Sequence, residues 1–414
     1  MVPMEAGKAT TSSSHIMLPP PIPHSMFSSR LPTDLEPNEF TTILQAQKAA
    51  GVRILDLTQS NPTEASFTYD FLQTGNIPGH IPGRYEPSAQ GLPEARDAIR
   101  RYYQGNRHGS ISAEDLFLTA GTSEAYGFLL KLLTEPGDEV LIPAPSYPLF
   151  DLLATLENVT PVRYALKLNE EGRWRIDFRS LELMISSLTR AIVVVNPNNP
   201  TGSYLTAEEL VRLNELCRIH DLALIVDEVF LDYINPQDGQ KPFSVITNRG
   251  ALTFTLSGLS KILALPQAKL GWIHVEGPAA LKEGAKARLE FIADTYLSVG
   301  SMVQQAAPAL LTCQQEIQSQ IMARTRANET ALRSATTLPH LHREGGWYAI
   351  LQLPDHITDE ECCLELLERH SLIVHPGFFY DFAESNRIVV SLIVPPEEFS
   401  RGLALIQEYL ESRG

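Results

Sequence analysis

Lys261 occupies a position that suits nucleophilic chemistry. It follows a short apolar β-type run, residues 252–256, and a second cation, Lys269, stands a few positions later. A lysine in partly apolar surroundings loses its proton more easily and then attacks carbonyl carbons. Most lysines after strands are solvated surface charges, so this feature alone predicts no catalysis. Polar groups at four other strand ends give it weight.

A candidate phosphate site follows the predicted strand at 115–119. There Gly121, Thr122 and Ser123 precede a predicted helix. The free N–H groups and the positive dipole end of a helix N-terminus favour an anion, typically phosphate. The same residues also suit an ordinary helix cap, and the sequence leaves both interpretations open.

Two further strand ends carry an aromatic ring and an amide. The run 139–142 leads to Tyr147, which suits stacking on a flat ligand, although a core tyrosine is the commoner case. The β-branched run 191–195 is typical of a strand buried on both faces, and it ends in a turn that contains Asn199. Two Asn–Pro steps favour a tight turn there whatever the function. A capping-box pattern that begins at Thr206 opens the next predicted helix.

Asp227 ends another apolar run, residues 222–226. A carboxylate at such a position is costly to bury unless a cation or an N–H group pairs with it. In open α/β sheets, ligands bind beyond the carboxyl ends of the strands. A phosphate-binding turn, an aromatic ring, an amide, a carboxylate and a lysine together suit pyridoxal phosphate. The carboxylate would keep the ring nitrogen of that cofactor protonated, and the lysine would form the Schiff base.

An alternation of strand, loop and helix positions these groups and predicts a mainly parallel α/β sheet. We expect this sheet in a large cofactor-binding domain, residues 64–297. A smaller α+β domain would combine residues 31–63 with 298–414. Residues 1–30, rich in Pro, Ser and Thr, predict a disordered or extended arm.

The composition excludes several classes of function. The chain has 414 residues, which fits two linked domains or one large α/β unit. Its net charge of −16 argues against a surface for nucleic acid or anionic membrane. The four cysteines have neither disulfide nor zinc spacing, so we expect no metal site and a cytoplasmic location. We expect no membrane span and no secretory signal.

The sequence resembles the fold-type-I pyridoxal-phosphate enzymes of the class I/II aminotransferase family, from roughly Ser29 to the C-terminus. Its most specific marks are the turn Asn-Pro-Asn-Asn-Pro-Thr-Gly at 196–202, the triplet Asp-Glu-Val that begins at Asp227, and Ser260-Lys261 followed by Gly-Trp at 271–272. The resemblance implies a mostly parallel, seven-stranded-type sheet with a smaller α+β domain beside it.

The family's site residues carry over to matching positions. Lys261 would be the internal-aldimine lysine and would move the proton between the substrate and the cofactor. Asp227 would pair with the ring nitrogen, Asn199 would bind the ring oxygen and Tyr147 would stack on the ring. The positions that would contact the cofactor are Tyr85, Gly121, Thr122, Ser123, Tyr147, Asn199, Asp227, Phe230, Ser257, Ser260, Lys261 and Lys269.

The resemblance also implies partners. Tyr85 matches a tyrosine that reaches the phosphate of the neighbouring subunit, which implies a homodimer. The substrates would be an amino acid and a 2-oxo acid. Arg387 would grip the substrate α-carboxylate with a bidentate guanidinium, and Asn61 and Asn199 would also contact the substrate.

Three departures from the family pattern bear on the cofactor contacts. Phe230 stands where tyrosine is usual, so a hydrogen bond to the ring oxygen is missing unless another group such as Tyr233 supplies it. Lys269 replaces an arginine, which keeps the charge but not the bidentate grip. Gly258 replaces a serine, with Ser257 one step earlier.

Three functions remain open at this point. The first is transamination of a neutral or aromatic amino acid, since Asp294 falls near the position where dicarboxylate-specific relatives carry an arginine. The second is a pyridoxal-phosphate lyase on the same fold, such as a carbon–sulfur lyase or an enzyme like aminocyclopropane-carboxylate synthase. The third is a non-catalytic regulator, which the short, cation-poor N-terminal segment disfavours. A nicotinamide dehydrogenase is disfavoured because no Gly-x-Gly-x-x-Gly follows a strand.

Overall fold

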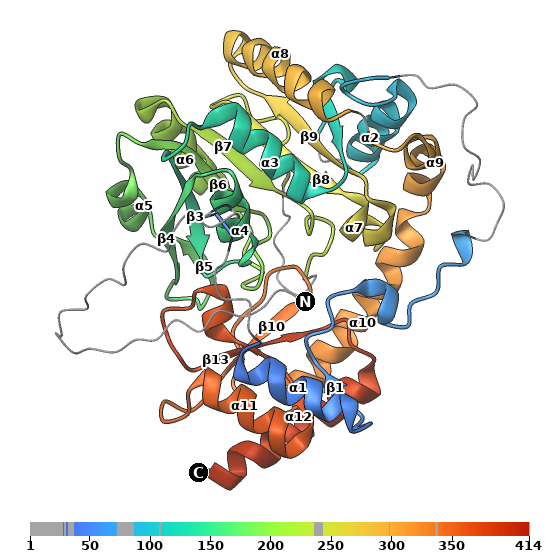
Figure 1. The fold of residues 1–414 in the computed structure, drawn as a ribbon, viewed down its shortest axis with the longest axis vertical. Helices are drawn as coiled ribbons and strands as arrows, with labels where there is room; N and C mark the ends of the chain where they lie inside the picture. The colour runs from blue at the N-terminus through green and yellow to red at the C-terminus, as the bar shows by residue number, and fades with distance from the viewer. Residues whose placement is uncertain are drawn as a thin grey trace.

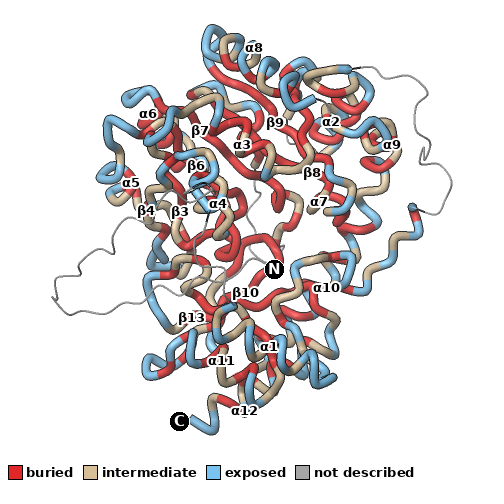
Figure 2. The backbone as a smooth tube through the Cα atoms, in the orientation of Figure 1, coloured by how far each residue is buried: buried red, intermediate tan, exposed pale blue. Residues whose placement is uncertain are grey.

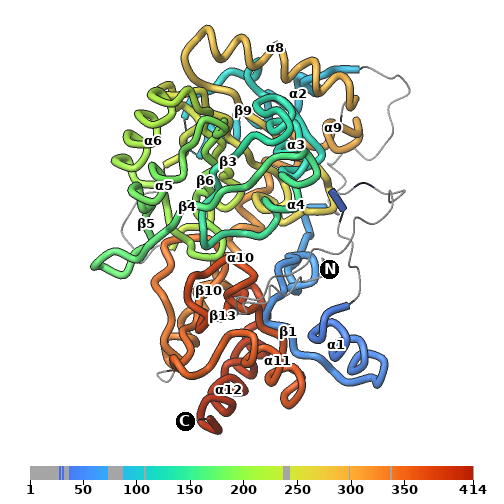
Figure 3. The backbone as a smooth tube through the Cα atoms, turned by 60° about the vertical axis from the view of Figure 1, so that its left-hand side comes forward, coloured from blue at the N-terminus to red at the C-terminus, as the bar shows by residue number. Residues whose placement is uncertain are grey.

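The computed structural model describes residues 28, 30–31, 37–72, 87–106, 109–235, 243–297, 299–335 and 338–413. Almost all of the predicted N-terminal arm, and Tyr85, lie outside these residues. The described chain has two parts, one built on a large mixed sheet and one on a small antiparallel sheet (Figures 1 and 3).

The large sheet has eight strands in the order β2-β9-β8-β7-β6-β3-β4-β5. The strands are β2 (Leu116–Thr119), β3 (Glu139–Ala144), β4 (Thr160–Leu168), β5 (Trp174–Ile176), β6 (Thr189–Val195), β7 (Ala223–Asp227), β8 (Thr253–Gly258) and β9 (Gly271–Glu276). The five strands β8, β7, β6, β3 and β4 are mutually parallel. The short β5 pairs antiparallel with β4, and so adds an edge strand to the expected seven.

Helices cover both faces of this sheet, as expected when the central strands are buried on both sides. One face packs against α2 (Pro93–Gly105), α5 (Phe178–Met184), α6 (Ala207–His220) and α9 (Ser301–Thr312). The other packs against α3 (Thr122–Leu133), α4 (Leu149–Leu156) and α8 (Ala279–Tyr296). Figure 2 shows the consequence: the central strands are buried, and the outer sides of the helices are exposed.

The second part is built on the sheet β10-β13-β12, in which both pairs are antiparallel. Its elements are β1 (Leu55–Asp56), β10 (Tyr348–Gln352), β11 (Leu372–Ile373), β12 (His375–Pro376), β13 (Arg387–Ser391), α1 (Glu39–Ala49), α10 (Gln314–Ser334), α11 (Asp359–His370) and α12 (Pro396–Arg413). N-terminal and C-terminal segments meet where β1 pairs in parallel with β11. The predicted domain boundaries at 63/64 and 297/298 stay a prediction.

Short helical turns connect these elements at several places. They are α7 (Leu259–Ile262), η1 (Pro62–Glu64), η2 (Asp70–Leu72), η3 (Ala113–Asp115), η5 (Pro266–Ala268) and η6 (Gly377–Tyr380). The predicted capping box is confirmed at the start of α6, where Thr206 and Glu209 each accept a hydrogen bond from the other's backbone N–H. In the described part of the chain, no helix is both long and apolar enough to span a bilayer.

Candidate active site

The order of the strands in the sheet brings the predicted site residues to one edge. The neighbouring strands β8, β7, β6 and β3 are followed by Lys261, Asp227, Asn199 and Tyr147 respectively, with Asp227 as the last residue of β7. All four strands run in the same direction, so these residues lie at their carboxyl ends. This is the edge at which open α/β sheets bind ligands.

Asp227 is a buried carboxylate with two hydrogen-bond donors. The Val229 backbone N–H donates to Oδ1 at 3.1 Å, and the Tyr126 hydroxyl donates to Oδ2 at 3.2 Å. Burial raises the pKa of Asp227 to about 6, and these two donors and the Lys261 ammonium oppose that rise. Each oxygen therefore keeps a free lone pair for a further donor.

Lys261 lies in α7, just beyond the end of β8, in an aromatic setting. Its ammonium is 4.8 Å from the ring centre of Trp347 and 5.3 Å from that of Phe230. Desolvation lowers the pKa of Lys261 to about 8, and the charge of Asp227 opposes the shift. An amine with such a pKa is present in part as a neutral nucleophile at neutral pH.

Phe230 and Tyr233 support the surroundings of Lys261. The Phe230 ring packs edge-to-face on Trp347, with ring centres 5.0 Å apart. The Tyr233 hydroxyl donates to the main-chain carbonyl of Lys261 at 2.5 Å. Tyr233 therefore holds the backbone of the lysine, which differs from the ring-oxygen contact considered from the sequence.

The start of α3 forms a cationic cradle with Lys269. Gly121 precedes the helix at φ 129°, a conformation that favours glycine, and a Cβ there would lie 3.8 Å from Lys269 Nζ. Gly271 packs on the Gly121 backbone, where an added Cβ would come within 3.0 Å of it. Thr122 and Ser123 contribute the first two residues of the helix. The dipole and the ammonium together suit an anion.

The serines near Lys261 are placed differently from one another. Ser257 is buried, and its hydroxyl hydrogen-bonds with Tyr103 in the core beneath the sheet. Ser260 lies half-buried in α7 beside Lys261. At Gly258 a Cβ would come within 3.0 Å of the Leu270 carbonyl oxygen, so this backbone approach accounts for the glycine.

Three asparagines follow β6, and they differ in their hydrogen bonding. Asn196 accepts from the Leu205 N–H, and Asn198 donates to the carbonyl of Pro145 and accepts from Ser146. Among the described residues, no donor reaches Oδ1 of Asn199, although that atom is buried. A buried acceptor without a partner suits a ligand donor.

Arg387 begins β13 and is only 8 % exposed. Its Nε and Nη1 have no hydrogen-bond partner in the described part of the chain. Gly377 makes room for it, since a Cβ there would come within 2.9 Å of the Arg387 side chain. Burying an unpaired guanidinium is costly, so this side chain suits a carboxylate or phosphate ligand.

Among the described residues, Tyr147 and Asn61 make no hydrogen bond or ion pair with Lys261 or Asp227. Tyr147 follows β3 with 44 % of its surface exposed. Asn61 caps η1, where its Oδ1 accepts from the Thr63 N–H at 3.1 Å. Tyr85 lies outside the described residues. Tyr296, at the end of α8, packs on Phe128, with ring centres 5.2 Å apart.

Sequence reasoning missed Tyr126, the hydroxyl partner of Asp227. The residue lies in the second turn of α3 and is only 4 % exposed. Its position one helical turn beyond Thr122, on a helix that starts beside the cradle, is the signal in the sequence. A tyrosine at such a spacing is usually a core residue, which explains the omission.

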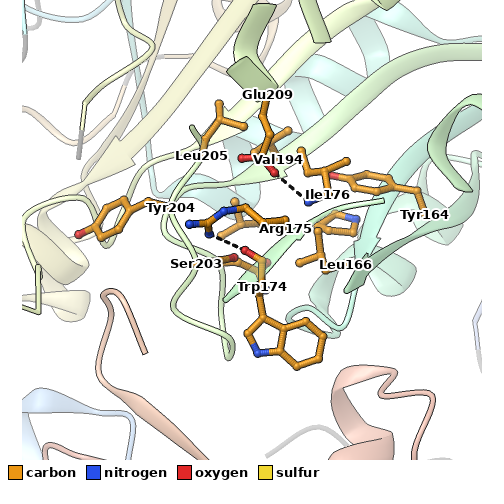
Figure 4. A pocket seen from close by; sticks show the side chains of 13 residues that line it. Tyr164, Leu166, Trp174, Arg175, Ile176, Val194, Ser203, Tyr204, Leu205 and Glu209 are labelled. Carbon is orange, nitrogen blue, oxygen red and sulfur yellow. Dashed lines mark hydrogen bonds between the residues drawn. The ribbon is translucent and has the colours of Figure 1, made fainter. Parts of the chain in front are cut away.

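A small, partly open cavity lies apart from Lys261 and Asp227. It is lined by side chains of β4, β5 and β6 and of the loop before α6 (Figure 4). There Glu209 accepts from the Ile176 N–H, and Arg175 donates to the Trp174 carbonyl. The space suits about one water molecule. Neither Lys261 nor Asp227 lines it, so we place the candidate site at the strand ends instead.

Comparison with known proteins agrees with this geometry. Residues 84–404 match the model of the family described as aminotransferase class I and II. An alanine aminotransferase of Mycobacterium tuberculosis is 30% identical over 378 residues, which cover 88% of this chain and 86% of the relative. Nicotianamine aminotransferase 1 of rice is 28% identical, over 78% of this chain and 67% of the relative.

Solved structures show the same fold at lower identity. The alanine aminotransferase from Pyrococcus furiosus superposes with a TM-score of 0.79 at 21% identity, over 91% of this chain and 96% of the other. The tyrosine aminotransferase from Leishmania infantum gives a TM-score of 0.74 at 20% identity, over 92% and 98% of the two chains. Family match and relatives together show that this chain belongs to the class I and II aminotransferases, the pyridoxal-phosphate-dependent transaminases.

Proposed function

We propose that this chain uses Lys261 to attach pyridoxal phosphate and moves an amino group from a neutral or aromatic L-amino acid to a 2-oxo acid. The observation that carries the proposal is the juxtaposition of Lys261 and Asp227 at the ends of neighbouring parallel strands. Burial moves the pKa of the amine down to about 8 and that of the carboxyl up to about 6. Titratable groups with opposing shifts are typical of catalytic sites.

The unpartnered groups of the site fit this cofactor and its substrate. Asn199 Oδ1 lacks a donor among the described residues, the cradle at Gly121 and Lys269 suits a phosphate, and Asp227 has lone pairs to spare. When bound, pyridoxal phosphate supplies an electron sink for a negative charge at the amino acid α-carbon. The residues named here would hold its phosphate, its ring oxygen and its ring nitrogen.

The side chains of this chain would divide the remaining tasks. Asp227 would accept a hydrogen bond from a protonated ring nitrogen, and Lys261 Nζ would take and return the proton at the α-carbon. Arg387 binds the α-carboxylate that every amino-acid and 2-oxo-acid substrate carries. Trp347 and Phe230 flank the Lys261 amine and limit its contact with water, which supports its lowered pKa.

The neutral donor class has two supports. Relatives named alanine aminotransferase are among the most similar in sequence. The side chains around the Lys261 amine, Trp347 and Phe230, are aromatic and carry no charge for a second carboxylate. An aromatic donor would also suit these rings, because aromatic pairs pack favourably.

The proposal includes a homodimer to which Tyr85 contributes a phosphate contact across the interface. Support comes from large apolar side chains left exposed at the end of α8 and the start of α9. Phe291 is 75 % exposed, Leu297 67 %, Tyr296 53 % and Met302 44 %. Exposed apolar side chains gathered at one place mark an interaction surface.

The decisive experiment is a visible absorption spectrum of the purified protein with pyridoxal phosphate, before and after a panel of amino acids is added. We expect a yellow band that Lys261→Ala abolishes and that neutral or aromatic amino acids bleach. Lys167→Ala, which removes an exposed lysine, is the matched control and should keep the band.

Each outcome has a definite meaning. Amino transfer that requires a 2-oxo acid supports the transaminase, whereas release of ammonia or pyruvate without one identifies a lyase. Bleaching by aspartate or glutamate alone contradicts the neutral donor class. No band at any cofactor concentration contradicts the proposal as a whole.

A further inference from the structure

Tyr126 is the only side chain whose hydroxyl contacts the Asp227 carboxylate in the described part of the chain. The hydroxyl donates to Oδ2 at 3.2 Å, while the Val229 backbone N–H donates to Oδ1 at 3.1 Å. One carboxylate oxygen is thus held by the main chain, and the other by a side chain from a different element, α3.

The Tyr126 ring is itself held in place. It meets the Phe150 ring edge-to-face, with ring centres 5.2 Å apart. Phe150 belongs to α4, which starts two residues after Tyr147. Tyr126 therefore contacts β7 through its hydroxyl and α4 through its ring, and α4 follows Tyr147, the proposed stacking residue. The position of the hydroxyl depends on packing between three elements of the fold.

The Tyr126 hydroxyl affects the protonation of Asp227. Burial raises the pKa of Asp227 to about 6; the Val229 N–H, the Tyr126 hydroxyl and the Lys261 ammonium pull it down. Burial and Asp227 raise the pKa of the Tyr126 hydroxyl, and Tyr164 adds to that rise, so this hydroxyl stays a donor. Without the hydroxyl, the protonated carboxyl would be favoured further, because a donor stabilises the ionised form more than the neutral one.

We propose that Tyr126 is a positioning residue that orients Asp227 and keeps it ionised at neutral pH for a cofactor's protonated ring nitrogen. The inference rests on the proposed function, which supplies that ring nitrogen. A neutral carboxyl would lack the charge that favours a protonated ring. Tyr126 would act only through Asp227, without contact to the substrate.

The test measures the affinity of the full-length protein for pyridoxal phosphate from pH 5 to pH 9, by equilibrium dialysis. In Tyr126→Phe the pH at which affinity declines should move up by about one unit, so affinity at pH 6 falls about fivefold and recovers near pH 9. Titration of the cofactor phosphate and of the Lys261 amine occurs in the unaltered protein and in Tyr126→Phe alike, and therefore cancels in their comparison.

Tyr164→Phe is the matched control. It removes another buried tyrosine hydroxyl, which donates to the Val193 carbonyl at 2.8 Å, without contact to Asp227. Its affinity profile should match that of the unaltered protein. In Asp227→Asn the decline of cofactor affinity that is due to protonation of Asp227 should vanish. Adding Tyr126→Phe to that variant should not shift its affinity profile further, because the tyrosine then has no carboxylate to act through.

The outcomes separate this inference from the proposed function. If the unaltered protein does not bind pyridoxal phosphate, the proposed function itself fails. If it binds and the profile of Tyr126→Phe is unshifted, only the role of Tyr126 fails. Should Tyr126→Phe not fold, Tyr126→Leu, which also lacks a donor, takes its place: a decline of affinity displaced to higher pH supports the inference, and an unshifted one overturns it.

Discussion

The ammonium of Lys261 lies 4.8 Å from the centre of the Trp347 ring, and the two residues come from different parts of the fold. Lys261 follows β8 of the large sheet, whereas Trp347 immediately precedes β10 of the small one. The fully buried indole shields one side of the amine from water, and its π face attracts the protonated form. Desolvation is the larger effect, which explains a lowered pKa beside a ring that favours the cation.

The Lys261 amine should lose its proton at a lower pH than an ordinary lysine. Because burial lowers its pKa to about 8 from an ordinary 10.5, its labelling by an amine-directed reagent should be half-maximal near pH 8 in the cofactor-free protein. Mass spectrometry of the labelled peptide gives the profile. The urea-unfolded chain is the control and should label near the ordinary value. Coinciding profiles would show that folding does not perturb this amine.

Replacement of Arg387 should lower the activity without lowering the stability of the protein. Arg387→Met removes a buried guanidinium with two nitrogens that lack a partner among the described residues, so the cofactor-free protein should unfold at the same temperature or higher. Its kcat/KM should fall at least about a hundredfold, because the substrate carboxylate loses its partner.

Exposed Arg369 provides the control for Arg387, since Arg369→Met removes a guanidinium that pairs with Glu365 on the same helix. That variant should keep its kcat/KM. A clear loss of stability in Arg387→Met, measured by thermal unfolding, would mean that the guanidinium has a structural partner within the protein.

Asp227→Asn should stabilise the cofactor-free protein at neutral pH. The pKa of Asp227 is raised from 3.8 to about 6, so the folded state binds this proton more tightly than the unfolded state. The resulting stabilisation is complete below pH 3.8 and is lost as pH rises through about 6.

The loss in the free energy of unfolding amounts to ~3 kcal/mol, because each unit of the raised Asp227 pKa corresponds to about 1.36 kcal/mol. An amide in place of the acid carries no such loss, so the variant should exceed the unaltered protein in stability at pH 7.5 and converge with it near pH 4. Denaturant titrations at the two pH values check this. Exposed Asp70→Asn serves as the reference, and an equal difference at both pH values would rule out titration of Asp227 as the cause.

The apolar surface at the end of α8 should mediate dimer formation. Phe291→Glu places a charge on a side chain that is 75 % exposed, and burial of that charge in an interface is unfavourable. Sedimentation equilibrium should show dimers for the unaltered chain and a weakened dimer, by about tenfold or more, for the variant.

Val211→Glu on α6 is the comparison for Phe291→Glu, because Val211 is 66 % exposed and lies on a different helix. It should leave the dimer intact. A dimer that tolerates Phe291→Glu but not Val211→Glu would place the interface on the opposite side of the sheet.

Several features followed from local pattern alone. The continuous apolar runs before Asn196 and Asp227 predicted buried strands, and the capping pattern at Thr206 predicted a helix start, because each depends on neighbours in the chain. A polar residue at the end of a buried strand has few explanations other than a partner or a ligand. This is why Lys261 and Asp227 could be singled out from the sequence.

Other features depend on the path of the chain through space. The strand order places Lys261, Asp227, Asn199 and Tyr147 side by side, although nothing in each strand's own residues encodes its neighbour. The Tyr126–Asp227 hydrogen bond joins residues 101 positions apart, and Lys261 meets Trp347 only because the two parts of the chain pack together.

The sequence by itself determined which side chains could do chemistry, since hydrophobic periodicity and capping are local properties. The tertiary structure alone decided which of them share a site and what their pKa values become. Desolvation and Coulomb interactions depend on every group within a few ångströms, whatever its distance along the chain. That is the physical reason why Lys261 was predictable as a candidate, whereas its aromatic setting and the Tyr126 hydroxyl were not.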